Sequence, residues 1–272
     1  MSTLGKAHEE DRTAALADEL HAARSIVVFT GAGVSTESGI ADFRSPGGIW
    51  SKIKPIQFDD YLRDPQQRLE DWRRRFHFQQ QFESSDPNEG HLAVASIING
   101  ESGLGLVTQN IDGLHQRAGV NDTDMVELHG NGTRASCLDC RAPMSLEEAK
   151  NRIDREGQPP NCQRCGGIVK PNIISFGQPM PADKLALAER WAHQCDLFVV
   201  LGSSLVVQPA ATLPLIAQQS GARLVIVNAQ PTPLDAVADL VLQRPIGATL
   251  VTALSHVALK PQDVEKNPGA NN

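Results

Sequence analysis

Four of the five cysteines form two Cys-x-x-Cys pairs, Cys137 with Cys140 and Cys162 with Cys165. Two such pairs supply four thiolates with the tetrahedral geometry that structural Zn²⁺ prefers, and a hairpin with a helix easily spans the 21 residues between them. The alternatives are two disulfides, which a reducing compartment disfavours, or free thiols. Because four sulfur ligands leave no open position, we expect one zinc ion that stabilises the fold and takes no part in catalysis.

A second pattern is a Gly-Ala-Gly turn at 31–33, directly after a run of β-branched and aromatic residues at 26–30. Such a run predicts a buried strand. Glycine lets a ligand approach the main chain, and the hydroxyl groups of Ser35 and Thr36 follow. Strand, glycine turn and free amide donors are how a dinucleotide pyrophosphate is held, but a tight turn between core elements explains a bare Gly-x-Gly equally well.

Polar residues also follow two later apolar runs. Gln109, Asn110 and Asp112 follow an expected strand at 104–108, and His129 stands at the end of another, at 125–130. Ligands of open α/β sheets bind beyond the carboxyl ends of the strands, and an imidazole with a pKa of about 6.5 suits a general base. The alternatives are helix capping by Asn and Asp and a structural histidine.

The elements that must position these groups alternate between strands and helices. Further strands are expected at 196–201 and 223–228, and helices at 11–24, 91–98 and 182–194. This alternation predicts an α/β fold with a doubly wound, mainly parallel, Rossmann-like sheet. The fifth cysteine, Cys195, is expected to pack in the core.

A small domain is expected to interrupt this sheet. It consists of a helical insert at 48–88, in which Asp64-Pro65 and Asp86-Pro87 bracket a helix, and of the zinc-binding part at 136–169. Arg73, Arg74 and Arg75 on the insert are expected to form a solvated helix face. The remaining segments, 12–47, 89–135 and 170–258, form the discontinuous Rossmann-like domain, and 260–272 is a polar tail.

The stretch from Gly31 to Arg44, GAGVSTESGIADFR, resembles the signature of the sirtuins, the NAD-dependent protein lysine deacylases, which usually have proline at Ala41. Similar motifs follow in the family's order at 108–115, around His129 and at 203–209, so the likeness covers about 24–254. Pro55-Ile56-Gln57 and the residues after it give a softer likeness to the branch that holds a mitochondrial animal member and plant relatives.

The resemblance implies a role for each matching residue. His129 is the general base, Asn110 and Asp112 hold the nicotinamide end of NAD, and Gln109 contacts the nicotinamide ribose. The resemblance thus implies that Asn110 and His129 are the catalytic residues. The implied NAD-binding residues are Gly31, Ala32, Gly33, Ser35, Thr36, Asp42, Phe43, Arg44, Trp50, Gln109, Asn110, Ile111, Asp112, Gly202, Ser203, Ser204, Asn228, Ala229, Gln230 and Ile246.

The likeness also implies that an acyl-lysine peptide adds a strand between two edges. One edge contains Ile174, Phe176 and Gly177, and the other contains Val206 and Val207. Gln178 stands where the family typically has an acidic residue. The alternative role of Arg73, Arg74 and Arg75 is a wall of the acyl-lysine tunnel. Trp72 replaces the tyrosine of a Tyr-x-x-Arg pair that sirtuins with a preference for acidic acyl groups carry, so that preference is not carried over.

The implied reaction moves the acyl group from lysine to ADP-ribose. Nicotinamide leaves, the acyl oxygen attacks the ribose C1′, and His129 accepts a proton from a ribose hydroxyl, while the loop at 42–44 shields the reacting centre from water. The products are lysine, nicotinamide and O-acyl-ADP-ribose. The alternatives are a protein mono-ADP-ribosyltransferase on the same fold, or a non-catalytic module that binds NAD or a peptide.

Length, composition and charge limit the class of protein, its partners and its location. The 272 residues, 40% of them hydrophobic and 21% charged, indicate a globular protein. A net charge of −7 argues against nucleic-acid binding, and the absence of a long apolar stretch argues against a membrane span. The polar N-terminus predicts neither a secretory signal nor a transit peptide, so the expected location is the cytoplasm. The expected partners are NAD and acylated-lysine proteins or peptides, and a monomer is the working expectation.

Overall fold

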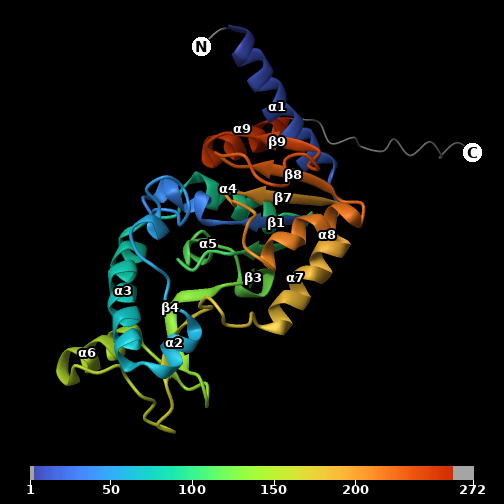
Figure 1. The fold of residues 1–272 in the computed structure, drawn as a ribbon. Coiled ribbons are helices and arrows are strands. Elements are labelled where there is room, and N and C mark those ends of the chain that lie inside the picture. Colours follow the sequence, from blue (N-terminus) through green and yellow to red (C-terminus); the bar gives the residue numbers. More distant parts are fainter. Residues whose placement is uncertain (1–2, 260–272) are drawn as a thin grey trace, which may run out of the picture.

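The computed structural model describes residues 3–259 of the chain, in a larger part and a smaller part that lies below it in Figure 1. The strands are β1 (Ile26–Thr30), β2 (Gly103–Thr108), β3 (Met125–Glu127), β4 (Gly130–Cys137), β5 (Pro143–Met144), β6 (Val169–Ile173), β7 (Leu197–Leu201), β8 (Arg223–Val227) and β9 (Leu240–Leu242). The α-helices are α1 (Thr3–Ala22), α2 (Phe58–Arg63), α3 (Pro65–Ser84), α4 (Glu89–Ile98), α5 (Leu114–Arg117), α6 (Leu146–Glu156), α7 (Ala182–Gln194), α8 (Leu213–Gln219) and α9 (Ile246–Leu259). Short 3₁₀ helices are η1 (Ala32–Ser38), η2 (Ile49–Ser51), η3 (Asp122–Asp124) and η4 (Ala210–Thr212).

The larger part is built on a six-stranded sheet of order β3-β2-β1-β7-β8-β9 in which every neighbouring pair is parallel. Its central strands β1 and β7 are buried along their whole length. Continuous apolar runs of this kind form strands that are covered on both faces. The predicted doubly wound α/β fold is therefore confirmed.

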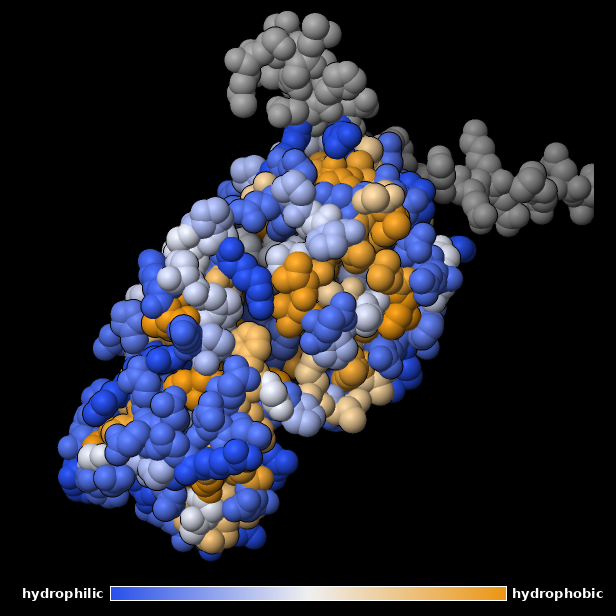
Figure 2. Space-filling view, in the orientation of Figure 1, coloured by the Kyte–Doolittle hydropathy of each residue, from blue (hydrophilic) through white to orange (hydrophobic). Residues whose placement is uncertain are grey.

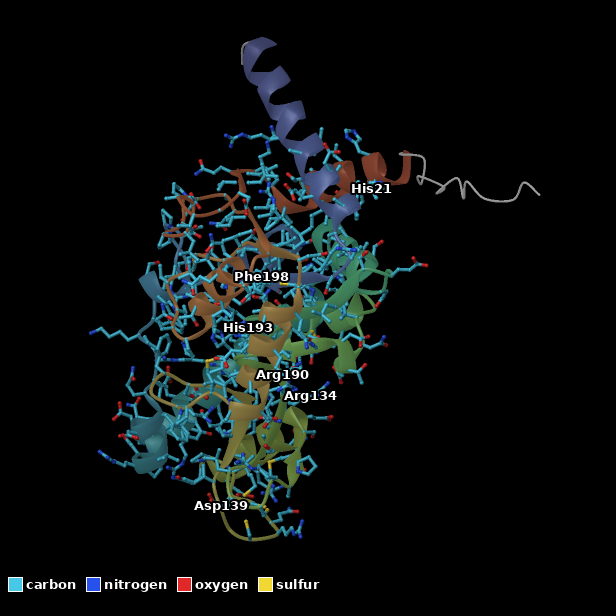
Figure 3. All side chains as sticks on the ribbon, turned by 90° about the vertical axis from the view of Figure 1, so that its right-hand side faces the viewer. His21, Arg134, Asp139, Arg190, His193 and Phe198 are labelled. Atoms are coloured by element: carbon cyan, nitrogen blue, oxygen red, sulfur yellow. The ribbon has the colours of Figure 1, made fainter. Side chains whose placement is uncertain are left out.

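Helices cover both faces of this sheet. Buried side chains of α1, α4 and α9 pack with one set of strand residues, while those of α7 and α8 pack with the other set. In Figure 3, Phe198 of β7 lies deep among these side chains, and its ring centroid is 5.9 Å from that of Phe29 on β1. Cys195 lies in the same core, as predicted.

The strand order reverses direction between β1 and β7, which pair with Thr30 opposite Leu201. In open α/β sheets, ligands bind at such a switch point, beyond the carboxyl ends of the strands. The turns that follow β1 and β7 are therefore placed side by side at the expected position of a ligand.

The smaller part contains α2, α3, α6 and an antiparallel sheet of order β5-β4-β6. Helix α3 begins as predicted, since the Asp64 side chain accepts a hydrogen bond from the Gln66 amide and Pro65 occupies the first turn. The face of this part seen in Figure 2 is mostly hydrophilic, with apolar residues showing in separate places. None of the helices within 3–259 is long and apolar enough to cross a bilayer.

Three expectations need correction or remain open. The helix expected at 11–24 begins at Thr3 and ends at Ala22. Residues 170–173 were expected to belong to the large sheet, but they form strand β6, which pairs with β4 in the small sheet. The reason is that β4 and β6 flank the two cysteine pairs and are paired with each other. Both strands lie at the proposed domain boundaries, so the division of the chain stays a proposal, and the tail at 260–272 lies outside the described residues.

Candidate active site

Two adjoining cavities lie beyond the carboxyl ends of the central strands, with volumes of about 560 and 190 Å³. They share part of their lining, which shows that they meet. The shared residues are Ala32, Phe43, Arg44, Gln109, Asn110 and His129. The glycine turn and the predicted base therefore face the same space.

All residues predicted to bind NAD line one or both cavities. The larger cavity adds Ser35, Trp50, Ile111 and Asp112 to the shared set. The smaller cavity adds Gly31, Gly33, Thr36, Asp42, Gly202, Ser203, Ser204, Asn228, Ala229, Gln230 and Ile246. The predicted peptide residues Ile174, Phe176, Gly177, Val206 and Val207 line the larger cavity.

The turn at 31–33 packs directly against the turn after β7. The Gly33 amide donates to the Gly202 carbonyl oxygen at 2.9 Å, and a Cβ atom at Gly33 would lie 2.7 Å from the Gly202 Cα. A Cβ at Gly31 would lie 2.7 Å from the Gly202 carbonyl oxygen. Glycine is thus required for the contact between the turns, and this contact leaves main-chain groups along the smaller cavity. The 3₁₀ helix η1 follows, in place of a long crossover helix.

The six residues that line both cavities form a shared wall, and a buried hydrogen-bond network lies behind it. The Ser35 hydroxyl donates to Asp112 Oδ2 at 2.7 Å, and Asn110 Nδ2 donates to the Ser35 oxygen at 3.2 Å. Asp112 Oδ1 also accepts the Leu114 amide at 2.9 Å, so this carboxylate caps α5 and orders the network at once. His91 Nε2 lies 3.4 Å from the Ser35 hydroxyl, and His91 Nδ1 accepts the Asn88 amide in a capping box.

His129 is held in one tautomer. Its Nδ1 lies 3.1 Å from the Gln109 carbonyl oxygen, which can only accept, so Nδ1 carries the proton and Nε2 is basic. Burial lowers the pKa of His129, the Gln109 carbonyl opposes this by favouring the charged ring, and Arg44 lowers the pKa further. The ring is therefore neutral at pH 7, the state that a general base requires.

The loop after η1 forms an aromatic roof. The ring centroids of Phe43 and Trp50 are 5.1 Å apart, and those of Trp50 and Phe176 are 5.7 Å apart. Asp42 Oδ1 accepts the amides of Arg44 and Ser45, and its Oδ2 accepts the Ser45 hydroxyl. The Asp42 carboxylate thus folds its own loop.

Glu37 and Asp71 line the cavities but were not predicted to do so. Glu37 lines the smaller cavity and its Oε1 accepts the amides of Ile246 and Gly247 at 2.9 and 3.2 Å. Its sequence signal was only its place in the motif at 31–44. Arg75 was expected on a solvated face, with a wall of the acyl-lysine tunnel as the alternative, and its side chain is 14% exposed and lines the larger cavity with Asp71. That expectation holds for Arg73 alone, which is exposed.

The segment 174–177 is not a strand, since β6 ends at Ile173. Phe176 forms an isolated bridge with Gln57, and its carbonyl oxygen accepts the Phe58 amide at 2.8 Å. The peptide-binding role of this edge stays a proposal.

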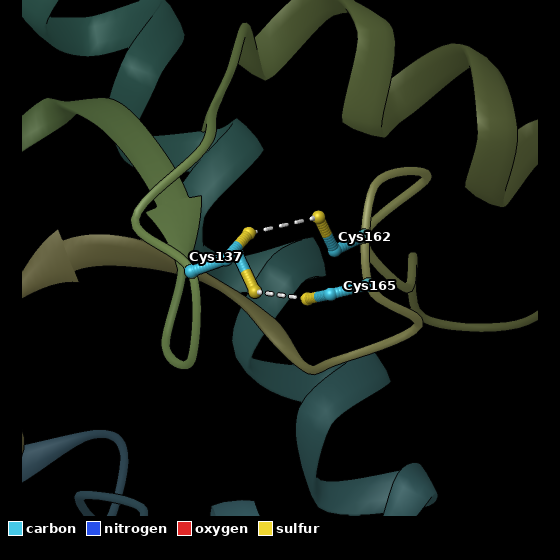
Figure 4. A group of neighbouring side chains, drawn as sticks. Cys137, Cys162 and Cys165 are labelled. Atoms are coloured by element: carbon cyan, nitrogen blue, oxygen red, sulfur yellow. Dashed lines mark hydrogen bonds between the residues drawn. The ribbon is translucent and has the colours of Figure 1, made fainter.

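The four paired cysteines converge at the end of the smaller part. Cys137 Sγ lies 3.5 Å from Cys165 Sγ, and Cys140 Sγ lies 3.6 Å from Cys162 Sγ. Figure 4 shows Cys137, Cys162 and Cys165 in this group, and Figure 3 shows the neighbouring Asp139 at the far tip of the molecule. All four sulfur atoms lie within 4.8 Å of one another. Disulfide bonds of about 2.05 Å are excluded by these distances, and the donor set fits one metal ion.

Comparison with known proteins agrees with this geometry. A model of the Sir2 family matches residues 31–209. The NAD-dependent protein deacetylase of Rhodopseudomonas palustris is 48% identical over 235 residues, 86% of this chain and 93% of the relative. NAD-dependent protein deacetylase 1 of Bradyrhizobium diazoefficiens is also 48% identical over 235 residues, with coverage of 86% and 92%. A solved structure described as "Sir2-p53 peptide-NAD+" is 33% identical, with a TM-score of 0.76 over 89% of this chain and 97% of that one.

Proposed function

Because this chain belongs to the Sir2 family, we infer that it is an NAD-dependent protein lysine deacylase of the deacetylase type, which transfers an acyl group from lysine to ADP-ribose. One observation carries this inference beyond likeness. His129, held neutral with a basic Nε2, lines the two meeting cavities together with Asn110 and the glycine turn. A non-catalytic binding module would not require that arrangement.

The smaller cavity suits the ADP part of NAD. A side chain at Gly31 or Gly33 would push apart the two turns that form its wall, and Ser203 and Ser204 line it as well. Glu37 fixes the amides at the start of α9, beside Ile246. NAD would supply a ribose whose nicotinamide is the leaving group.

The shared wall suits the reacting end of NAD. Asn110 and Asp112 are ordered through Ser35, which preorganises them to hold a carboxamide. Gln109 Nε2 donates to the Ser203 hydroxyl at 2.8 Å, which joins the two cavities by a polar bridge. His129 Nε2 accepts a proton from a ribose hydroxyl, and the Phe43–Trp50 roof keeps water away from this centre.

The larger cavity suits the acyl-lysine. Phe176 and Val206 line its rim and are 41% and 53% exposed, an unusual exposure for apolar side chains that supports docking of a peptide there. The peptide would lie between the edges at 174–177 and 206–207.

The four-cysteine site suits Zn²⁺, since four thiolates at tetrahedral spacing are its common structural ligands. It lies at the tip of the smaller part, and Cys137 and Cys162 belong to the core of that part together with α3 and α6. Zinc there stabilises the smaller part, which carries one wall of the larger cavity.

The proposal also covers the cellular location, the binding partners and the oligomeric state. A cytoplasmic location is part of the proposal, because a reducing compartment would keep the four paired cysteines free of disulfide bonds. The bacterial relatives give no support for the branch that holds mitochondrial animal and plant members. Binding of NAD and acylated peptides without nucleic acid, and a monomeric state, also belong to the proposal.

The test is a reaction of the full chain with NAD and an acetyl-lysine peptide, followed by mass spectrometry. We expect loss of the acetyl group and formation of nicotinamide and O-acetyl-ADP-ribose in equal amounts. Nicotinamide release on unacetylated protein, with ADP-ribose retained on that protein, would instead identify a mono-ADP-ribosyltransferase. Tight binding of both substrates without any product would identify a binding module.

A further inference from the structure

The proposed peptide edge at 174–177 depends on its neighbours for its position, because it follows the end of β6 and belongs to no strand. The Ile174 amide donates to the His129 main-chain oxygen at 2.9 Å. The Phe176 main-chain oxygen accepts the amide of Phe58, the first residue of α2, at 2.8 Å. The place of this edge is therefore set by how β6 ends and by where α2 begins.

Lys170 is a buried cation that contacts both of these elements. Its side chain is 2% exposed, and its Nζ atom donates to the main-chain oxygens of Pro171 and Ile173 at 3.4 and 2.5 Å. The same atom lies 6.0 Å from the ring centroid of Phe58 and 5.7 Å from that of Tyr61. A cation is attracted to an aromatic face within about 6 Å. One ammonium group thus joins the end of β6 to the first turns of α2.

The Lys170 side chain is mostly charged at pH 7 in spite of its burial. Burial lowers its pKa to about 8, the nearby Asp71 on α3 opposes this by raising the pKa, and Arg75 lowers it. A buried ammonium is costly to desolvate, and an apolar side chain of similar volume is often no worse for stability. The charge at this position therefore calls for a reason beyond packing.

We propose that Lys170 is a positioning residue for the substrate peptide, and that its ammonium holds the edge at 174–177 in the arrangement to which an acyl-lysine peptide binds. The proposal rests on the deacylase function above. Lys170 lines neither of the two cavities, so it acts through the main chain of Ile173 and through Phe58. An edge that is ordered before binding loses less conformational entropy when the peptide pairs with it.

The test is the variant Lys170→Met, which removes the charge and the donors but keeps most of the volume. We expect the Kd of an acetyl-lysine peptide, measured by titration calorimetry, and its KM to rise about ten-fold, the size of one hydrogen bond to a charged group. The Kd of NAD and kcat should stay within about two-fold of the wild type. Lys170→Arg keeps a cation that can donate to the same oxygens, and should bind the peptide more tightly than Lys170→Met.

Lys150→Met is the matched control, because Lys150 lies on α6 of the same part, is 50% exposed and pairs with Asp154 at 2.6 Å. It should bind the peptide as the wild type does. Unchanged peptide affinity in Lys170→Met, equal losses for peptide and NAD, or no advantage of Lys170→Arg overturns the proposal. Failure of Lys170→Met to fold also overturns it, since Lys170 would then support the whole smaller part.

Calorimetry separates this proposal from the proposed function. A wild type that binds the acetyl-lysine peptide but does not turn it over with NAD would refute the deacylase function, while the affinities of the variants would still test Lys170. A wild type that does not bind the peptide at all would overturn both proposals.

Discussion

The Nδ1 atom of His129 lies 3.1 Å from the main-chain oxygen of Gln109, and the two residues follow β3 and β2, which pair in the large sheet. The Leu128 amide continues that pairing by donating to the Thr108 oxygen at 2.9 Å. The His129 main-chain oxygen in turn accepts the Ile174 amide at 2.9 Å, from the proposed peptide edge. The sheet itself thus fixes the tautomer of the base and connects it to the substrate wall.

Replacement of this base should separate chemistry from binding. We expect His129→Ala to lower kcat for deacylation by about 10²- to 10⁴-fold, the usual contribution of a general base, with little change in NAD affinity. Steady-state turnover and titration calorimetry with NAD measure the two effects. Turnover at the wild-type rate would remove His129 from the mechanism.

The pH profile should report the neighbourhood of His129. Because its pKa lies below the ordinary value of about 6.5, the basic form still prevails at that pH, and kcat/KM should decline only in more acidic solution. Arg44→Gln removes a positive charge that lowers this pKa, and the midpoint of the acid limb should therefore move to higher pH. Arg223→Gln, at the far end of β8, is the control. An acid limb that stays in place in Arg44→Gln contradicts the assignment, whatever the absolute rates.

The contact between the two turns predicts a strict glycine requirement. A methyl group at Gly33 meets main-chain atoms of Gly202 at 2.7 Å, which only a shift of a turn can relieve. We expect Gly33→Ala to cost about 1 to 3 kcal/mol of unfolding free energy and to weaken NAD binding by at least ten-fold. Gly39→Asn is the control, because Gly39 has a positive φ but no neighbouring atom within 4 Å of the position that a Cβ would take. Equal NAD affinity in both variants would argue against the turn as the NAD cradle.

Local patterns predicted most of the elements because their causes are local. Helix α7 spans 182–194 as expected, and the apolar runs ended by polar turns became β1, β2, β7 and β8. The same rule placed Gln109, Asn110 and His129 at one edge of the sheet. The pairing of β6 with β4 was missed because strand pairing across the cysteine loop has no local signal.

Arg75 shows a different limit of the sequence. Its helix carries charges on several faces, and only tertiary packing decides which face meets the cavity and which meets water. The spacing of Asp71, Arg75, Phe78 and Phe82 was a usable signal, because a stripe that mixes aromatic residues with an ion pair is unusual for a solvated face. Glu37 is harder to find, since its partners Ile246 and Gly247 lie more than 200 residues away.

Loss of one thiolate should release the metal and unfold the smaller part. We expect Cys137→Ser to reduce bound zinc from about one equivalent to well below it, and to lower the melting temperature together with deacylation. A strong chelator should do the same to the wild type. Cys195→Ala is the control, because Cys195 is buried in the other part and should cost stability without loss of metal. Full zinc content in Cys137→Ser would exclude the four-sulfur site.

The buried His115 should make stability depend on acidity. Its Nε2 lies 3.0 Å from the Thr30 hydroxyl, which itself donates to Thr108, so Nε2 carries the ring proton. Burial, and then the nearby His91, lower its pKa to about 3. Below pH 6.5 the unfolded chain therefore binds a proton that the folded chain does not, and His115 alone should cost about 1.4 kcal/mol of stability for each pH unit down to about 3.

Urea unfolding between pH 7.5 and 5 measures this slope. His115→Asn should be less stable at every pH, because it loses the contact with Thr30, but its stability should fall less steeply as the solution becomes acidic. The difference between the two slopes reports His115 together with its effect on the neighbouring His91, since protonation of the cysteine thiolates affects both proteins alike. Parallel curves would mean that the folded chain binds the proton at position 115 and that the ring is not sealed from water.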